Sequence, residues 1–279
     1  MAIPLLAGFN GSALVDGYQV LATNGTVTLE NTQTFVTLMD IIPDSIQRSK
    51  VLYAPGIYAT SGSLSWDVHS NAMDLLLPSR LLQRGYSFTV SMWGGNIGSN
   101  YAGKQVQHCY ATSITMQGAQ GGLLNVSLSF ISPDAISDWN GGSYISTRSD
   151  SASNTPYGYW YSGNANIPVK DWNLSINQDV TPVHLNQYAQ QSNSGTMYAK
   201  YMKCGLWNTD LSVTTFRQLS SGEEVSDLNN VVVATKAFNI VGLVRTRNYN
   251  FTGSSDASTY SYTFGSASMN LLPNVTIVS

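Results

Sequence analysis

Histidine and cysteine are the side chains best suited to chemistry near neutral pH, and this chain of 279 residues has few of them. The histidines are His69, His108 and His184, and the cysteines are Cys109 and Cys204. His108 and Cys109 are adjacent, and a cysteine next to a histidine can act as a nucleophile with its base. Neighbouring residues of a strand point to opposite faces, however, so this pair is badly placed for a mutual hydrogen bond. The pair does not predict a catalytic site.

Motifs for other kinds of catalysis are missing from the sequence. It contains no nucleophile elbow, phosphate-binding loop, dinucleotide fingerprint or two-histidine zinc motif. The two distant cysteines form neither a disulfide framework nor a zinc site. Asp67, Asp74, Glu223 and Glu224 could be paired as in glycoside hydrolases, but the sequence gives no reason to pair them, and solvated positions or subunit contacts explain them better. We therefore expect a protein that is not an enzyme and that binds no cofactor or metal.

The low content of charged residues points to an assembled protein. Charged residues make up 10% of the chain, against about 25% in an average protein. A free monomer with so few charges is poorly protected from self-association. The sequence therefore favours a chain that works inside an assembly, and a secreted β-protein with a surface rich in Ser and Thr is the alternative.

The sign of the charge and the hydropathy exclude two classes of partner. The net charge is −3 and the pI is about 5.5, whereas tight binding to nucleic acid needs clustered Lys and Arg. No apolar run approaches the roughly 20 residues that span a bilayer. The first residues lack the basic segment of a signal peptide, so we expect folding in a cytoplasm.

The chain is organised around the segment from Gly62 to Val90, which reads as strand, short helix and strand. The first strand alternates apolar and polar residues, and the last does so again with aromatic and β-branched types. Ser70 is a plausible helix N-cap, a second helical piece follows Pro78, and Gly85 stands where a left-handed C-cap would end it. The apolar positions of the two strands are Leu64, Trp66, Val68, Tyr86, Phe88 and Val90.

Further alternating segments predict a mainly β fold with an internal duplication. In the second half, Trp172–Ile176 aligns with Val27–Asn31, and the weakly helical Gly222–Asn229 takes the place of the first helix. We expect two tandem β-sandwich or barrel domains, 1–137 and 167–279, each flanked by a short α-helix. The other expected strands are 26–30, 35–39, 108–116, 124–130, 211–216 and 259–264, with turns at 94–103 and 118–122.

Residues 138–166 are expected to link the two domains. They are rich in Ser, Asn and Gly, which is typical of a linker. They also contain Tyr157, Tyr159, Trp160 and Tyr161, which indicate contact with something else. A packed interface, a glycan platform and a strap folded back on the protein all fit these aromatic residues.

Residues 40–56 are a candidate contact loop between subunits. A Pro and several charges interrupt the alternation there, and a long connection inside a β-domain is usually functional. A plain surface loop is the other reading. The candidate contact residues are Asp40, Ile41, Ile42, Asp44, Ile46, Arg48 and Lys50.

Parts of the first half resemble the tail tube proteins of long-tailed bacteriophages. The similarity lies in SGSLSWDVHSNAMDLL with YSFTV after it, in Tyr101–Gly103, in YATSITMQ, and in the segment from Gly121 that reads GGLLNVSLSF. It covers about half of the chain. The second half is similar more faintly and lacks an equivalent of Gly121 and Gly122.

The resemblance implies a β-sandwich flanked by a helix, six of which join sheet edges into a ring. Rings stack into a tube through which double-stranded DNA passes without specific binding. A duplicated domain implies three chains per ring, a homotrimer with pseudo-hexameric symmetry. It also implies tail terminator, tail tip and tape-measure proteins as partners, a place in the virion tail, and assembly in the host bacterial cytoplasm.

The acidic charge balance is compatible with such a conduit. A DNA duplex carries about one phosphate charge per 1.7 Å, so a basic wall would hold the DNA instead of releasing it. The alternative function is a carbohydrate-binding or adhesin-type β-sandwich at a phage tail tip or cell surface, which would need an exposed shelf of aromatic residues.

Overall fold

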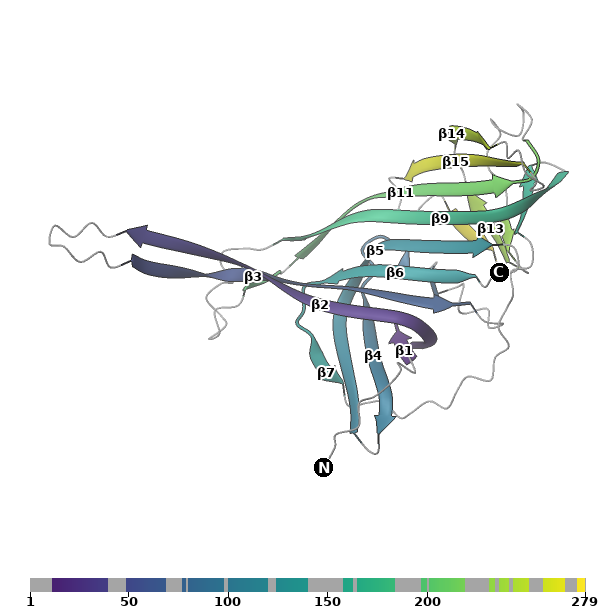
Figure 1. Ribbon diagram of the computed structural model, residues 1–279. Helices are drawn as coiled ribbons and strands as arrows, with labels where there is room; N and C mark the ends of the chain where they lie inside the picture. The colour runs from purple at the N-terminus through teal and green to yellow at the C-terminus, as the bar shows by residue number, and fades with distance from the viewer. Residues whose placement is uncertain are drawn as a thin grey trace.

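The computed structural model is mainly β-structure in the part of the chain that it describes (Figure 1), as the sequence predicts. It describes residues 12–39, 49–68, 77–78, 80–97, 100–119, 124–139, 158–162, 165–183, 197–199, 201–218, 231–233, 236–240, 243–250, 258–268 and 275–278. The strands are β1 (Ser12–Val15), β2 (Tyr18–Met39), β3 (Ser49–Asp67), β4 (Phe88–Ile97), β5 (Asn100–Ala119), β6 (Asn125–Ser132), β7 (Ser137–Trp139), β8 (Gly158–Ser162), β9 (Ala165–Val183), β10 (Met197–Tyr198), β11 (Tyr201–Thr215), β12 (Val231–Val233), β13 (Lys236–Ile240), β14 (Leu243–Asn250), β15 (Thr259–Ser268) and β16 (Val275–Val278).

Eight strands form one continuous antiparallel sheet, here called the main sheet. Its order is β14-β15-β11-β9-β5-β6-β3-β2, and Figure 1 shows these strands stacked from top to bottom. Every second residue of the strands faces the core, as β6 shows with its strict alternation of buried and half-buried residues. Leu64, Ile114, Leu128, Leu174 and Leu211 belong to this buried set and lie in one hydrophobic cluster. The core is therefore shared by both halves of the chain.

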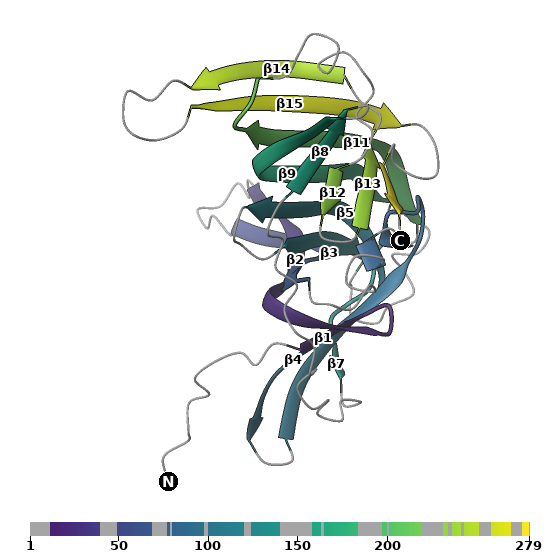
Figure 2. The same ribbon diagram turned by 90° about the vertical axis from the view of Figure 1, so that its right-hand side faces the viewer.

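A second layer packs against the core face of the main sheet. In the first half it has the order β7-β5-β4-β1-β2, and in the second half β16-β13-β12-β8-β9 (Figure 2). Phe88 of β4 meets Phe130 of β6 edge to face at 6.3 Å between ring centroids, so the rings join the two layers. The two layers share β2 and β5 in the first half and β9 in the second half.

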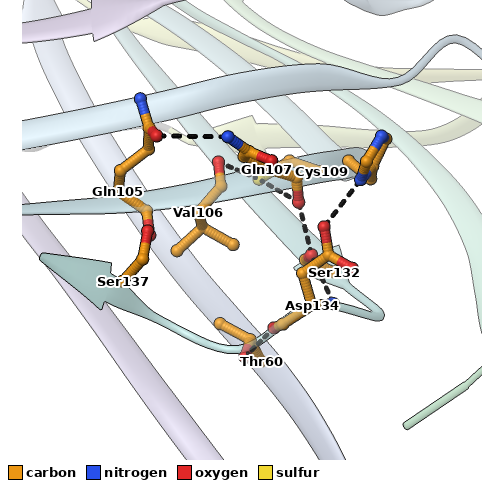
Figure 3. A network of polar contacts seen from close by, with 9 residues as sticks. Thr60, Gln105, Val106, Gln107, Cys109, Ser132, Asp134 and Ser137 are labelled. Atoms are coloured by element: carbon orange, nitrogen blue, oxygen red, sulfur yellow. Dashed lines mark hydrogen bonds and ion pairs between the residues drawn. The ribbon is translucent and has the colours of Figure 1, made fainter. Parts of the chain in front are cut away.

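Strand β5 takes part in both layers because it bends near His108. The backbone of His108 has a φ of +46°, a left-handed conformation that is uncommon outside glycine. Polar contacts hold the bend: the Ser132 hydroxyl donates to the Gln107 carbonyl oxygen at 2.6 Å and accepts from the Asp134 N–H at 3.0 Å. The Thr60 hydroxyl donates to the Asp134 carbonyl oxygen (Figure 3). Because Thr60 and Ser132 are fully buried, these bonds fix the place where β5 changes layer.

One helical turn lies where the sequence predicts a helical piece after Pro78. The Leu82 N–H donates to the Pro78 carbonyl oxygen at 3.0 Å, and Leu81 and Leu82 are buried in the core. Gly85 has a φ of +75°, which is the left-handed cap expected of it. The helix expected at 69–76 and the second helix expected at 222–229 lie outside the described residues.

A polar cluster attaches this turn to the β1–β2 hairpin. Asp16 and Gly17 both have positive φ, which gives the two-residue turn that suits a hairpin. One oxygen of the Asp16 carboxylate accepts from the Tyr86 hydroxyl at 2.7 Å and from Arg80 Nε at 2.9 Å. The turn is thereby held beside the second layer.

The strand pairings of the first half recur in the same order in the second half. In the first half the order is β7-β5-β4-β1-β2 and then β2-β3-β6-β5. In the second half it is β16-β13-β12-β8-β9 and then β9-β11-β15-β14, so β13 and β14 together occupy the place of the bent β5.

Irregularities of the pairing also recur. In β2–β3 one residue is skipped between the pairs Ala22↔Trp66 and Asn24↔Ser65. In β9–β11 one residue is skipped between Val169↔Thr215 and Asp171↔Thr214. These bulges place Asn24 and Asp171 at corresponding positions, so Trp172 corresponds to Gly25. The sequence comparison aligned Trp172 with Val27 instead, which is two residues further along β2.

A second bulge, next to the bend of β5, also recurs in the other half. In β5–β6 Thr112 is skipped between Ala111↔Phe130 and Ser113↔Ser129. In β14–β15 one residue is likewise skipped between Val244↔Phe264 and Thr246↔Thr263. Ser113 and Thr246 thus occupy corresponding positions in β5 and β14.

The two halves are joined by strand pairing. The end of β5, from Ser113 to Ala119, pairs with β9 from Asn177 to Asp171. Gly118 lies opposite Trp172, and a Cβ added to Gly118 would lie 2.8 Å from the indole nitrogen, so only glycine allows this close approach. We call this pairing the internal joint. The halves also meet where the guanidinium of Arg84 donates to the Cys204 carbonyl oxygen at 3.0 Å.

Two expected irregular segments are partly strands. Of the expected turn at 94–103, residues 94–97 end β4 and residues 100–103 begin β5. Of the expected linker, residues 138–139 belong to β7, residues 158–162 form β8 and residues 165–166 begin β9. Tyr159, Trp160 and Tyr161 therefore lie in a strand that pairs with β9 and β12, and the strong β-propensity of aromatic residues explains this.

Candidate assembly surfaces

The main sheet has a second face, opposite the core, that consists mostly of short polar side chains. Their positions alternate with buried residues along each strand, and the pairing register places them in continuous rows across the sheet. We call this surface the polar face. Its described residues are Asn24, Thr26, Thr28, Ser61, Ser63, Ser65, Asp67, Ser113, Thr115, Gln117, Asn125, Ser127, Ser129, Asp171, Asn173, Ser175, Asn177, Asn208, Asp210, Ser212, Thr214, Ser261 and Thr263.

Neighbouring side chains of the polar face bond to each other. The hydroxyls of Thr26 and Ser63 lie 2.8 Å apart, and so do those of Ser65 and Ser127. Side chains opposite each other on paired strands are about 5 Å apart at Cβ, so these short groups meet without bending. Some of the polar groups therefore find their hydrogen-bond partners within the polar face itself.

The charged residues among those that define the polar face are acidic, namely Asp67, Asp171 and Asp210. Beyond the bulge of β11 the same rows continue with Asp179 and Thr181 of β9 and with the exposed Lys203, which lies opposite Thr181. The Asp67 carboxylate accepts from Asn125 Nδ2 at 2.9 Å. Such a surface has nothing to hold a phosphate, because its anions repel phosphate and its amides and hydroxyls are weak, uncharged partners.

A long hairpin arm extends from the main sheet. Strands β2 and β3 remain paired as far as Met39↔Ser49, well beyond the sandwich, and Figure 1 shows them projecting from the body. Of the seven candidate contact residues, Lys50 lies in this arm opposite Leu38. The loop was expected over residues 40–56, but residues 49–56 belong to strand β3. The other candidates, Asp40, Ile41, Ile42, Asp44, Ile46 and Arg48, lie outside the described residues.

The two ends of the main sheet are open edges in the part of the chain that the structure describes. Beyond Leu21, β2 pairs only with β3, and β14 pairs only with β15. Each edge carries an exposed apolar side chain: Leu29 of β2 is 41% exposed and Tyr249 of β14 is 43% exposed. An open edge is a template for another strand.

The histidine–cysteine pair does not come together. The His108 ring is exposed and its Nδ1 lies 2.6 Å from the Asp134 carboxylate, whereas Cys109 is fully buried. Burial raises the pKa of the Cys109 thiol, and the thiol donates to the Val106 carbonyl oxygen at 3.4 Å. The thiolate needed for a nucleophile is thus disfavoured.

Of the four candidate carboxylates, the structure describes only Asp67. Among the described residues, no group of three or more His, Cys, Asp or Glu could hold a metal ion. Asp67 lies on the polar face, and Asp74, Glu223 and Glu224 lie outside the described residues. Trp66 and Trp172 are buried, as their strand phase predicts. No described helix has the length and apolarity needed to cross a membrane.

Sequence reasoning missed the polar face, although the signal is present. We used the apolar positions of segments such as Leu124–Phe130 to find strands, and the positions between them are uniformly Ser and Asn. A solvated face usually carries Lys and Glu, so the uniformity itself is the signal. What the sequence could not show is that these strands lie side by side.

A scan against models of known protein families found no match to this sequence, and neither did a search of curated proteins.

Proposed function

We propose that this protein is the structural subunit of a bacteriophage tail tube, in which rings of the chain stack into a conduit for DNA. The observation that carries the proposal is the polar face, a broad uncharged-to-acidic surface on one side of a sheet whose other side is fully packed. The sequence resemblance of the first half to tail tube proteins gives the proposal its specific form.

The size of a ring fits a conduit. The repeated pairing order supports two units per chain, each with four strands in the main sheet. Three chains then supply six units and a barrel of about 24 strands, and barrels with more than about 16 strands enclose an aqueous channel. At about 4.8 Å between strands the circumference is at least about 115 Å, which corresponds to a diameter of about 35 Å before strand tilt widens it. This is wide enough for a duplex when the polar face lines the lumen.

The chemistry of the polar face suits passage and not binding. Each Lys or Arg that contacted a phosphate would release a counterion and add affinity, which the polar face avoids by having neither. Short side chains bonded to each other also present no long groups that would protrude into the lumen. DNA would slide past without specific contacts.

The hairpin arm supports stacking. It projects beyond the sandwich, where it can reach the next ring. We propose that the candidate residues from Asp40 to Lys50 make this contact. Tail terminator, tip and tape-measure proteins would bind the ends and the lumen of the finished tube, inside the virion.

Electron microscopy of the purified protein tests the proposal. We expect rings with six-fold pseudosymmetry that stack into hollow tubes, and a mass of three chains per ring by light scattering. A monodisperse monomer at all concentrations, with no rings, would overturn it. Glycan binding by that monomer would favour the adhesin alternative, although exposed Tyr201 and Phe216 lie at opposite ends of β11 and make no shelf.

A further inference from the structure

The internal joint shows what an edge of this sheet looks like once it is paired. It joins β5 of the first half to β9 of the second half in antiparallel register, with Met116 opposite Leu174 and Ile114 opposite Ile176. All four side chains are at most 1% exposed. The joint thus continues the hydrophobic core from one half into the other.

The open edges are the counterparts of the two strands in that joint. The repeated bulges place Asn24 of β2 at the position of Asp171 of β9. Counting along the strands, Val27 then corresponds to Leu174 and Leu29 to Ile176. Strand β2 therefore presents the same kind of edge as β9.

The same comparison applies to the other edge. The bulges before Ser113 of β5 and before Thr246 of β14 correspond, so Tyr249 occupies the position of Met116. Met116 is fully buried by the internal joint, whereas Tyr249 is 43% exposed and is in contact with Tyr260 at 5.8 Å between ring centroids. Strand β14 therefore corresponds to the edge that β5 pairs with β9, but among the described residues no strand pairs with this edge of β14.

We infer that β14 of one copy pairs with β2 of the next copy and repeats the internal joint between chains. The inference rests on the proposed ring and specifies its interface. The occupant of each open edge is a second copy of this chain, because the molecule already contains the same two edges joined. The contact is head-to-tail, as a ring requires.

The internal register dictates the register between copies. Thr115 lies opposite Ser175 in the internal joint. Their counterparts are Asn248 and Thr28, so these two residues lie opposite each other on the polar face of the joint between copies. On the core side, Tyr249 lies opposite Val27, where exposed apolar surface of both edges becomes buried.

Disulfide cross-linking tests this register directly. In a Cys204→Ser background, the double variant Thr28→Cys/Asn248→Cys is expected to give covalent dimers and trimers on a non-reducing gel. The matched pair Thr115→Cys/Ser175→Cys is expected to close within one chain, without a change in mass. The shifted pair Thr28→Cys/Tyr249→Cys places its thiols on opposite faces and should cross-link at least tenfold less.

The outcomes separate this inference from the proposed function. Rings in the microscope without a 28–248 cross-link, when the 115–175 control closes, overturn the inference and leave the ring intact. Specific cross-linking into open chains without rings supports the inference and overturns the tube. Absence of both overturns both. A Tyr249→Glu variant should also lose assembly, while Glu at the exposed Tyr201 should not.

Discussion

At the scale of single residues, the buried polar and thiol groups have structural roles. Ser132 and Thr60 stabilise the bend of β5, and the left-handed φ of His108 is tolerated because its ring reaches Asp134. Cys109 lies beside this bend with its thiol fully buried. Its surroundings favour the neutral form, which gives a test in solution.

We expect Cys109 to resist thiol reagents in the native protein. Burial raises its pKa in the folded state, so the thiol form contributes stability that is fully present below the unfolded pKa of about 8.5 and is lost as the pH rises above it. In a Cys204→Ser variant, labelling by Ellman's reagent at pH 8 should be slow and should become complete in urea. Rapid labelling in native buffer would contradict this assignment, and a Cys109→Ala variant gives the background rate.

Single residues were also where prediction from the sequence was most and least successful. The buried phase of Leu64, Trp66 and Val68 and the cap at Gly85 followed from local alternation and from glycine's conformational freedom. The bend at His108 could not be foreseen, because it depends on Ser132 and Asp134 from another strand. The alignment of Trp172 with Val27 was two residues out of register. Because side chains alternate between faces with a period of two, such a shift keeps every side chain on the same face and does not disturb the alternation of apolar and polar residues.

At the scale of elements, the hairpin arm and the open edges would make different contacts in the proposed assembly. The edges run along the two sides of the main sheet and suit contacts around a ring, whereas the arm extends along its strands beyond the end of the sheet. The sequence predicted the strand at 35–39 but not its partner at 49–56, because pairing such as Thr34↔Ala54 is non-local. The open edges were expected only from the resemblance to tail tube proteins.

Shortening the arm should abolish tubes and leave rings. Residues 35–53 can be replaced by an Asn-Gly turn, since Thr34 and Ala54 are paired and a two-residue loop closes such a hairpin. We expect a folded, soluble protein that forms rings without stacking, as judged by circular dichroism and electron microscopy. Tubes of normal length from this variant would exclude the arm as the stacking contact, and Lys50→Ala alone should have little effect.

At the scale of the whole molecule, the polar face is the feature that would let DNA pass through the proposed tube. A basic lumen would convert the conduit into a binding site. The variant Ser63→Lys/Ser127→Lys/Ser175→Lys would add about nine positive charges per ring of three chains, each able to contact a phosphate. These substitutions lie on a solvated face, so the core should not change.

We expect tubes of this triple-lysine variant to retain DNA at low salt. Linear duplex DNA should remain bound in 50 mM salt and be released steeply by 200 mM salt, because the log of the affinity falls with the log of the salt concentration in proportion to the phosphates neutralised. Wild-type tubes and a triple Ser→Gln variant should retain none at either salt. Equal retention by the Gln variant would refute the electrostatic explanation.

Finally, the internal joint changes how assembly depends on the amount of protein. In the proposed ring, every second contact is made within a polypeptide, where its two strands are held at a high effective concentration whatever the dilution. Only the alternate contacts require an encounter between separate molecules. Fusion of two units therefore halves the number of contacts that must form between separate molecules, and favours closure of the proposed ring while the protein is still scarce.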